Sequence, residues 1–339
     1  MKLWALVAAN PTAFQAVFQT GLSAAIANVK TTTSSPQEPD YVYGIWKTGV
    51  QSWDAGLRAI LNPLGYSVEV GGVYCHASTF VTWTPMQSST KKSVEIGDLL
   101  VIARCTEPGP NGQLQSWNSA MLLQAKRSGW NSPLPSDDQF DLYHSVPSFT
   151  YTLRNQAKNS SAKSPLVGQS RNLGPIPHLG AQYHFIDEAF VGYRNPISDW
   201  AKDVSKTRNP DLPLAMELAN LLQNTSGRPF PISRPAPARS DWDQVIWDLL
   251  DETARSYFTR RAMTGAGAAA TTRGHLCLAS GTSSMLKDVL ASIEPSFRWS
   301  EANVPPSLSD FQEAEEDEPE GGLPILVIDL SLNQERRHT

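Results

Sequence analysis

The chain has few cysteines and no long apolar run. Its three cysteines, Cys75, Cys105 and Cys277, include no CxxC pair, which argues against a disulfide framework and a zinc knuckle. A reducing, cytoplasmic compartment fits this usage best. No segment reaches the roughly 20 uninterrupted apolar residues that a membrane-spanning helix needs. The first residues, MKLWALVAANPTA, run straight into a helical pattern, which favours retention over export. We therefore expect no membrane partner.

Several catalytic motifs are also missing. The sequence has no HExxH pair, Walker loop or GxSxG elbow, which argues against zinc proteases, P-loop NTPases and α/β-hydrolases. The stretch GAGAAA from Gly265 follows a helical pattern and not a strand, so it reads as a loop. Cys75 and His76 are neighbours in a predicted strand, so their side chains point to opposite faces. We assign that pair a structural role.

Charge does not separate nucleic-acid binders from other proteins here. The formal net charge is −5, but six acids lie in one run, EAEEDEPE at 313–320. Removing these six charges leaves +1, which neither supports nor excludes DNA. The run itself is expected to be a solvated loop, with shielding of a basic cleft as the alternative.

Hydrophobic periodicity and turn residues predict an α/β protein in three parts. Residues 1–39 form a helix and a polar linker, 40–192 a core of one helix followed by strands, and 193–339 a mainly helical C-terminal part with the acidic loop 313–320 and a final strand. The expected helices span 11–30, 43–65, 211–227, 240–262 and 283–295, and the expected strands span 66–76, 78–84, 93–105, 119–127, 181–187 and 323–332.

The clearest local feature is a hairpin. The segment PGPNG centres on Asn111 and Gly112, residues that suit the positive φ angles of a tight turn. A symmetric register around this turn places Asp98 opposite Gln124 or one residue away. Since side chains alternate along a strand, Gln124 and Lys126 share one face and Ala125 points to the other.

A carboxylate, an amide oxygen and an ammonium would then gather beside apolar strands. Such groups are costly to bury without partners. Mg²⁺ binds one or two carboxylates together with waters and phosphate oxygens, so Asp98 and Gln124 are predicted to hold Mg²⁺ or Mn²⁺. Lys126 is predicted to orient the attacking water or to offset charge on a phosphate. Glu95 would be a further metal ligand if Gly97 introduces a bulge.

These residues resemble the PD-(D/E)XK nuclease superfamily, in which an Asp and a (Glu/Asp)-X-Lys pair lie on adjacent strands. Asp98 matches the first position, Gln124 occupies the Glu position and Lys126 matches the lysine, as in the QxK variant of Mrr-like enzymes. The resemblance implies a restriction-endonuclease-like mixed sheet flanked by helices. The stretch EIGD lacks the customary proline, and for the acid that many members carry on the first helix the candidate is Asp54.

The resemblance implies metal-dependent phosphodiester hydrolysis, with DNA preferred to RNA as the substrate and a role in bacterial restriction or antiviral defence. An activating protein partner is a further expectation. Two alternatives stay open. The chain could be a non-catalytic adaptor that retains the fold, or LLQAK could be a plain core strand with Asp98 capping a turn. Basic side chains that could track phosphates include Lys91, Lys92, Arg127 and Arg171; the tryptophans nearby read mainly as core.

Overall fold

The computed structural model describes residues 2–74, 79–84, 90–127, 142–143, 148–152, 165–173, 180–187, 192–195, 212–231, 241–264, 276–277 and 323–332. Several predictions fall outside these ranges: the helix at 283–295, the loop from Gly265, the acidic run 313–320 and the Cys75–His76 pair. Among the described helices, none combines the length and the apolar character needed to cross a bilayer.

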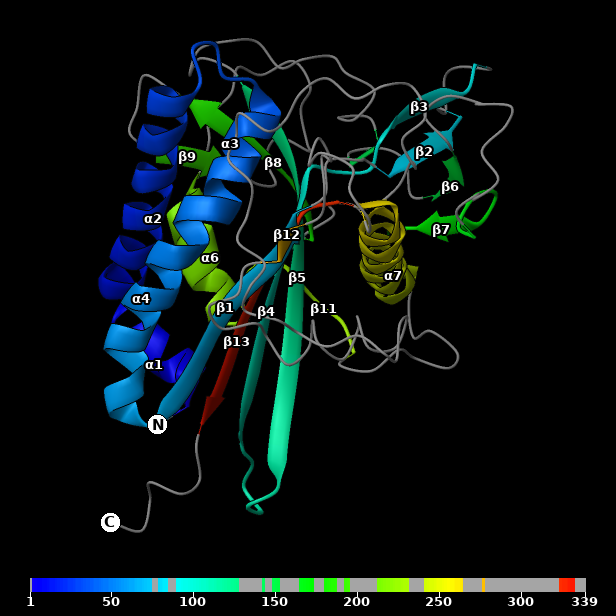
Figure 1. The fold of residues 1–339 in the computed structure, drawn as a ribbon. Helices are drawn as coiled ribbons and strands as arrows, with labels where there is room; N and C mark the ends of the chain where they lie inside the picture. Colours follow the sequence, from blue (N-terminus) through cyan, green and yellow to red (C-terminus); the bar gives the residue numbers. More distant parts are fainter. Residues whose placement is uncertain are drawn as a thin grey trace.

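The described chain is a mixed α/β structure built on one large mixed sheet (Figure 1). Its strands run in the order β10-β9-β8-β5-β4-β13-β1-β12, and β11 pairs with β5. Strands β4 and β5 are antiparallel, whereas β13 is parallel to β4 and β8 is parallel to β5. The strands are β1 (Tyr66–Tyr74), β4 (Leu99–Pro108), β5 (Leu114–Arg127), β8 (Ala181–Asp187), β9 (Gly192–Asn195), β10 (Leu212–Pro213), β11 (Arg228–Pro229), β12 (Leu276–Cys277) and β13 (Ile325–Leu332).

The final strand lies inside this sheet. The sequence 323–332 predicts a strand, and β13 indeed spans Ile325–Leu332. It pairs with β4 on one side and with β1 on the other. Its six residues from Ile325 to Leu330 are all buried, as expected for a strand covered on both faces. The C-terminal part of the chain therefore supplies a central strand of the sheet that carries the hairpin.

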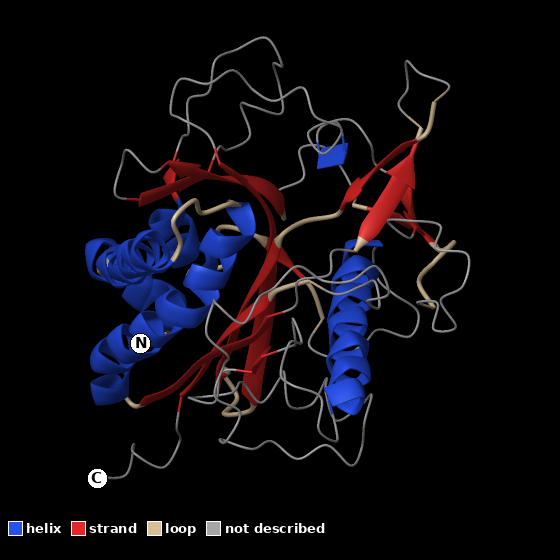
Figure 2. Cartoon of the chain, turned by 45° about the horizontal axis from the view of Figure 1, so that its top comes forward, coloured by secondary structure: helices blue, strands red, loops and turns tan. Residues whose placement is uncertain are grey.

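Helices cover one face of the sheet (Figure 2). The long helix from residue 38 to 61 contains a π-helical turn at Ile45–Gly49, and it begins inside the segment predicted as a linker. Helix α2 packs against this helix and against α6. The helices on this face are α1 (Leu3–Ala9), α2 (Pro11–Thr32), α3 (Glu38–Gly44), α4 (Val50–Leu61) and α6 (Leu214–Leu222).

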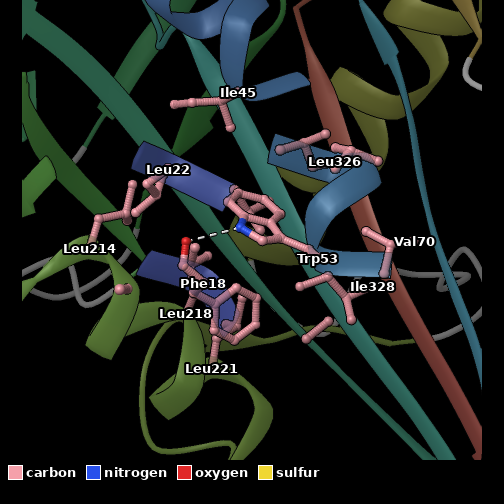
Figure 3. Packing of buried hydrophobic residues seen from close by; sticks show 14 of the residues in the cluster. Phe18, Leu22, Ile45, Trp53, Val70, Leu214, Leu218, Leu221, Leu326 and Ile328 are labelled. Atoms are coloured by element: carbon pink, nitrogen blue, oxygen red, sulfur yellow. Dashed lines mark hydrogen bonds between the residues drawn. The ribbon is translucent and has the colours of Figure 1, made fainter. Parts of the chain in front are cut away.

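The core on this side joins helices and strands that are distant in the sequence. Figure 3 shows Trp53 of α4 against Phe18 of α2, with the indole Nε1 donating to the Phe18 carbonyl oxygen at 3.1 Å. Gly21 makes this contact possible, because a Cβ there would lie 2.3 Å from the Trp53 Nε1. Leu326 and Ile328 of β13 complete the cluster. The α2–α4 pair is therefore fixed to the sheet.

The opposite face carries α7 (Asp241–Thr264) and a small antiparallel sheet. Trp242, Ile246, Leu249 and Leu250 of α7 are buried, as the sequence predicts. Trp83 is buried in the same apolar cluster as these α7 residues. This confirms the core role that the sequence predicts for it. The small sheet has the order β3-β2-β6-β7, with strands β2 (Phe80–Trp83), β3 (Lys92–Glu95), β6 (Ser148–Thr152) and β7 (Ser170–Asn172).

The segment predicted as one strand at 93–105 is two strands. β3 ends at Glu95 in the small sheet and β4 begins at Leu99 in the large one. Gly97 lies at the crossing, where a Cβ would come within 2.7 Å of the Leu122 side chain. β3 is only partly buried and Val94 is its single apolar residue, whereas β4 is apolar and mostly buried. The segment before Gly97 is therefore too short and too polar for its pattern to mark it as a separate strand.

Candidate functional site

The hairpin has the register that its turn predicts. Leu99 pairs with Leu123 and Pro108 with Leu114, and the same register continued by one residue sets Asp98 opposite Gln124. The turn differs in detail: Gly112 has φ +76°, but Asn111 does not share this conformation. The Gly109 N–H donates to the Gln113 carbonyl oxygen at 2.6 Å, so the loop is longer than a two-residue turn.

Asp98 is held in place from both sides. Its own N–H donates to the Leu123 carbonyl oxygen at 2.8 Å, and its carboxylate Oδ2 accepts the Ala125 N–H at 2.7 Å. Just upstream, the Tyr143 hydroxyl donates to the Ile96 carbonyl oxygen at 2.5 Å. The carboxylate is therefore fixed at the point where β4 begins and β5 ends.

Gln124 contacts Asp98 directly. Its amide Nε2 donates a hydrogen bond to Asp98 Oδ2. The side chain is almost fully buried, with 1% exposed, and its Oε1 has no hydrogen-bond partner within the described ranges. A buried acceptor without a partner costs about 1–3 kcal/mol. Gln124 thus offers an unpaired buried oxygen next to a carboxylate.

Lys126 lies two residues after Gln124 on β5, and its positive charge also acts on Asp98. Its Nζ lies 4.0 Å from Glu38 Oε2, at the first residue of α3. Ala125, between Gln124 and Lys126, packs into the helix-side core. The alternation expected for Gln124, Ala125 and Lys126 is therefore present, and both polar side chains act on Asp98.

Burial and neighbouring carboxylates raise the pKa of Asp98 well above its usual value. Burial has the largest effect, and the negative charges of Glu95 and, more weakly, Glu38 add to it. The positive charge of Lys126 and the hydrogen bond from Ala125 lower the pKa of Asp98, but they do not outweigh the rest. A cation placed here would relieve this unfavourable desolvation and repulsion.

Glu95 lies close enough to Asp98 to raise its pKa. The chain brings the two residues together by changing sheets and not, as predicted, by a bulge within one strand. The sequence suggested a bulge within one strand, whereas the chain leaves the small sheet after Glu95 and enters the large sheet at Leu99. Strand alternation therefore does not determine which way Glu95 points relative to Asp98. Its carboxylate is the largest electrostatic contributor to the raised pKa of Asp98.

The acid on a helix that acts on Asp98 is Glu38, which the sequence analysis does not single out. The candidate Asp54 instead accepts a hydrogen bond from Arg58 Nε at 2.7 Å and one from the Val70 N–H at 3.2 Å, so it joins α4 to β1. A signal for Glu38 was present: Gln37 and Asp40 form a reciprocal capping box, and acids fill the first turn of α3. These features mark a helix start at residue 38.

Arg171, which the sequence suggested as a phosphate contact, and His184, which it did not single out, contribute less to the site. Arg171 pairs with Asp248 at 2.7 Å and ties β7 to α7, so it has a structural partner. His184 on β8 pairs in register with Ala125, and burial lowers the pKa of His184 to about 3. Within the described residues, no three His, Cys, Asp or Glu side chains form a group suited to a metal. The described acids thus provide at most an incomplete set of ligands.

The described site consists of Asp98, Gln124 and Lys126 on one hairpin, with Glu95 and Glu38 acting on Asp98 from β3 and α3. This arrangement could bind a cation through oxygen atoms and hold an ammonium beside it. Comparison of the chain with models of protein families, with curated proteins and with solved structures finds no match in any of the three.

Proposed function

We propose that the chain is a metal-dependent nuclease that hydrolyses phosphodiester bonds, with DNA as the preferred substrate. The observation that supports this most strongly is the register of the hairpin, which brings Asp98, Gln124 and Lys126 together at one end of two buried strands. The restriction-endonuclease-like fold and the role in bacterial restriction or antiviral defence are parts of the same proposal, and they rest on the resemblance to the PD-(D/E)XK superfamily.

The residues fit a divalent cation such as Mg²⁺ or Mn²⁺. Asp98 would supply a carboxylate oxygen, and Gln124 would supply the Oε1 that is now buried without a partner among the described residues. Turning the amide about its last bond would bring Oε1 toward Asp98 in place of Nε2. Glu95 would add a further oxygen ligand. Mg²⁺ is well served by such a partial set, since waters and substrate phosphate oxygens complete its octahedron.

The protein side chains have separate roles in this proposal. A bound cation would polarise the phosphate and stabilise its developing charge. Lys126 would orient the attacking water or hold a phosphate oxygen. Glu38, 4.0 Å from the Lys126 ammonium, would hold this side chain in place near Asp98. The hydrogen bond from the Ala125 N–H would fix the Asp98 carboxylate.

A non-catalytic adaptor that retains this fold is the second candidate. One observation favours it: Asp98 already accepts hydrogen bonds from Gln124 and Ala125, so the carboxylate is satisfied without a cation. In that case the Asp98–Gln124 contact would serve only to close the hairpin.

Cleavage assays separate the two candidates. Supercoiled plasmid, linear duplex DNA and single-stranded RNA would be incubated with Mg²⁺ or Mn²⁺ and the wild type, Asp98→Ala or Lys126→Ala. We expect metal-dependent cutting of DNA that is lost in both variants. Lys2→Ala is the matched control, because it also removes one positive charge, but from an exposed residue. The neighbouring Leu3 N–H donates to Glu107, which lies at the opposite end of β4 from Asp98.

The outcome that would contradict a nuclease is equally definite. If nothing is cut, the assay would be repeated with cell extract or phage lysate, which tests for an activating partner. Continued inactivity, together with no Mg²⁺ or Mn²⁺ binding by calorimetry, would exclude the nuclease and support the adaptor.

A further inference from the structure

On the face of the large sheet that packs against α7, the side chains change from apolar to polar along the strands. Near α7 it is apolar and buried, with Leu100, Ile102, Leu122, Ile325 and Val327 in the cluster that α7 and the small sheet cover. The next side chains on this face of the four neighbouring strands are Asn118, Arg104, Asp329 and Glu69. Asn118 pairs with Arg104, Arg104 with Asp329, and Asp329 with Glu69. We refer to these four residues as the polar row.

The polar row does not mark the end of the buried part of these strands. On the opposite face, the residues next to it remain buried and apolar: Cys105, Leu330 and Val68 all belong to the helix-side cluster. Beyond the row, the α7-facing surface stays polar, and the hydroxyls of Thr106 and Ser116 share a hydrogen bond of 2.7 Å. Polar residues therefore replace apolar ones on one face only, across four adjacent strands.

Asn118 is the residue that points to a ligand. It is buried, with 2% exposed, and neither its Oδ1 nor its Nδ2 has a hydrogen-bond partner in the part of the chain that the structure describes. Buried side-chain amides nearly always satisfy both atoms. The neighbouring Asp329 is 7% exposed, and its Oδ1 lies 3.8 Å from Arg104 Nε. The unpaired amide thus lies beside a partly buried charge pair, in which Arg104 is more exposed than Asp329.

The charges of the row restrict the chemistry of a ligand. The guanidinium of Arg104 disfavours a cation, while the carboxylates of Asp329 and Glu69 disfavour an anion. A neutral molecule that presents donors to a carboxylate and acceptors to Arg104 and Asn118 suits this row. An aromatic residue adjoins the row, since the Phe230 N–H donates to the Asn118 carbonyl oxygen at 3.3 Å and the Phe230 ring lies in the α7-side cluster.

We propose that the polar row binds a nucleobase, guanine in preference to adenine. Guanine offers two adjacent N–H donors to a carboxylate such as Asp329, and its O6 and N7 accept hydrogen bonds from arginine and amide groups such as Arg104 and Asn118. Adenine would turn a ring acceptor toward the carboxylate. This binding site is separate from the Asp98 site and does not depend on the nuclease activity.

Calorimetry on the full chain tests the proposal, with deoxyguanosine as the probe and deoxyadenosine and inorganic phosphate as comparisons. We expect saturable binding of deoxyguanosine, weakened about tenfold or more by Asn118→Leu and by Asp329→Asn. Asp98→Ala should bind as the wild type does. Asn118→Leu removes an unpaired buried amide, so its melting temperature should not fall. If it does not fold, Asp329→Asn, which preserves the side-chain size, decides the test.

Four results would overturn the inference. They are no binding of deoxyguanosine, equal binding of deoxyadenosine, binding of phosphate alone, and deoxyguanosine binding that is unchanged in folded Asn118→Leu and Asp329→Asn. The last result would place the bound base elsewhere on the chain.

Discussion

The Lys126 ammonium lies 4.0 Å from the Glu38 carboxylate, so an ion pair links the end of β5 to the start of α3. Both residues act on Asp98, with opposite signs: Glu38 raises the pKa of Asp98 and Lys126 lowers it. The protonation of Asp98 therefore depends on three separate elements, namely the hairpin, α3 and the strand β3 that ends in Glu95.

This dependence predicts an order of effects on Asp98. Glu95→Gln should lower the pKa of Asp98 more than Glu38→Gln does, because Glu95 is the larger electrostatic cause. Lys126→Met should raise it. The carboxyl chemical shift of Asp98, followed by NMR across a pH titration, measures each change, and Glu69→Gln on β1 serves as the distant control. Equal shifts for Glu95→Gln and Glu38→Gln would contradict the order.

Asp98 should also make the protein less stable as the pH rises. Its pKa is raised on folding, so the folded state binds the proton more tightly than the unfolded chain. The stabilisation is fully present below the unfolded pKa of about 4 and is lost as the pH rises through the folded value, at about 1.4 kcal/mol per unit of pKa difference. Asp98→Asn lacks this loss and should be the more stable protein at neutral pH.

Urea denaturation at several pH values measures this difference. A second set of measurements in saturating Mg²⁺ tests whether this stability difference arises at the metal site. Bound metal should stabilise the wild type and leave the stability of Asp98→Asn almost unchanged. If the two proteins show the same pH dependence of the free energy of unfolding, the environment of Asp98 is not as we describe it.

The hairpin could be predicted from sequence because its determinants are local. Turn residues near Gly112 and side-chain alternation along the strands set the register, and the structure has that register. The contact between Asp98 and Gln124 follows from it. The loop at Gly109–Gln113 differs from a two-residue turn because only Gly112 adopts the positive φ.

The parts that sequence reasoning missed depend on tertiary contacts. The position of β13 between β4 and β1 cannot be read from its apolar run, which suits any buried strand. The break at Gly97 is hidden because β3 is short and only partly buried, so its pattern does not separate it from the apolar run of β4. Glu38 meets Lys126 only because α3 lies over the end of β5, and Asp54, the helix acid expected from sequence, pairs with Arg58 instead.

The junction between α7 and β13 depends on one hydroxyl group. Thr253 Oγ1 accepts the Leu323 N–H at 2.9 Å and donates to the Leu323 carbonyl oxygen at 3.1 Å, and Thr253 is buried. Thr253→Val keeps the shape but leaves both backbone groups unpaired, so it should cost about 1–3 kcal/mol of the free energy of unfolding. Thr253→Ser keeps the hydroxyl and should cost less. Equal losses in urea denaturation would show that packing, and not the two hydrogen bonds, holds the junction.

Gln124 provides the sharpest test of metal binding, because glutamine and glutamate have the same size and differ by one charge. Gln124→Glu would set a second carboxylate against Asp98, whose pKa is already raised by burial and by Glu95. Without metal this variant should be less stable than the wild type at neutral pH, since like charges repel at short range. With Mg²⁺ it should bind more tightly, by about tenfold or more, since the added charge favours a divalent ion. Gln124→Leu, which removes the oxygen ligand, should bind metal more weakly. Calorimetric titration of the three proteins measures the series, and no gain for Gln124→Glu would mean that residue 124 does not contact the metal.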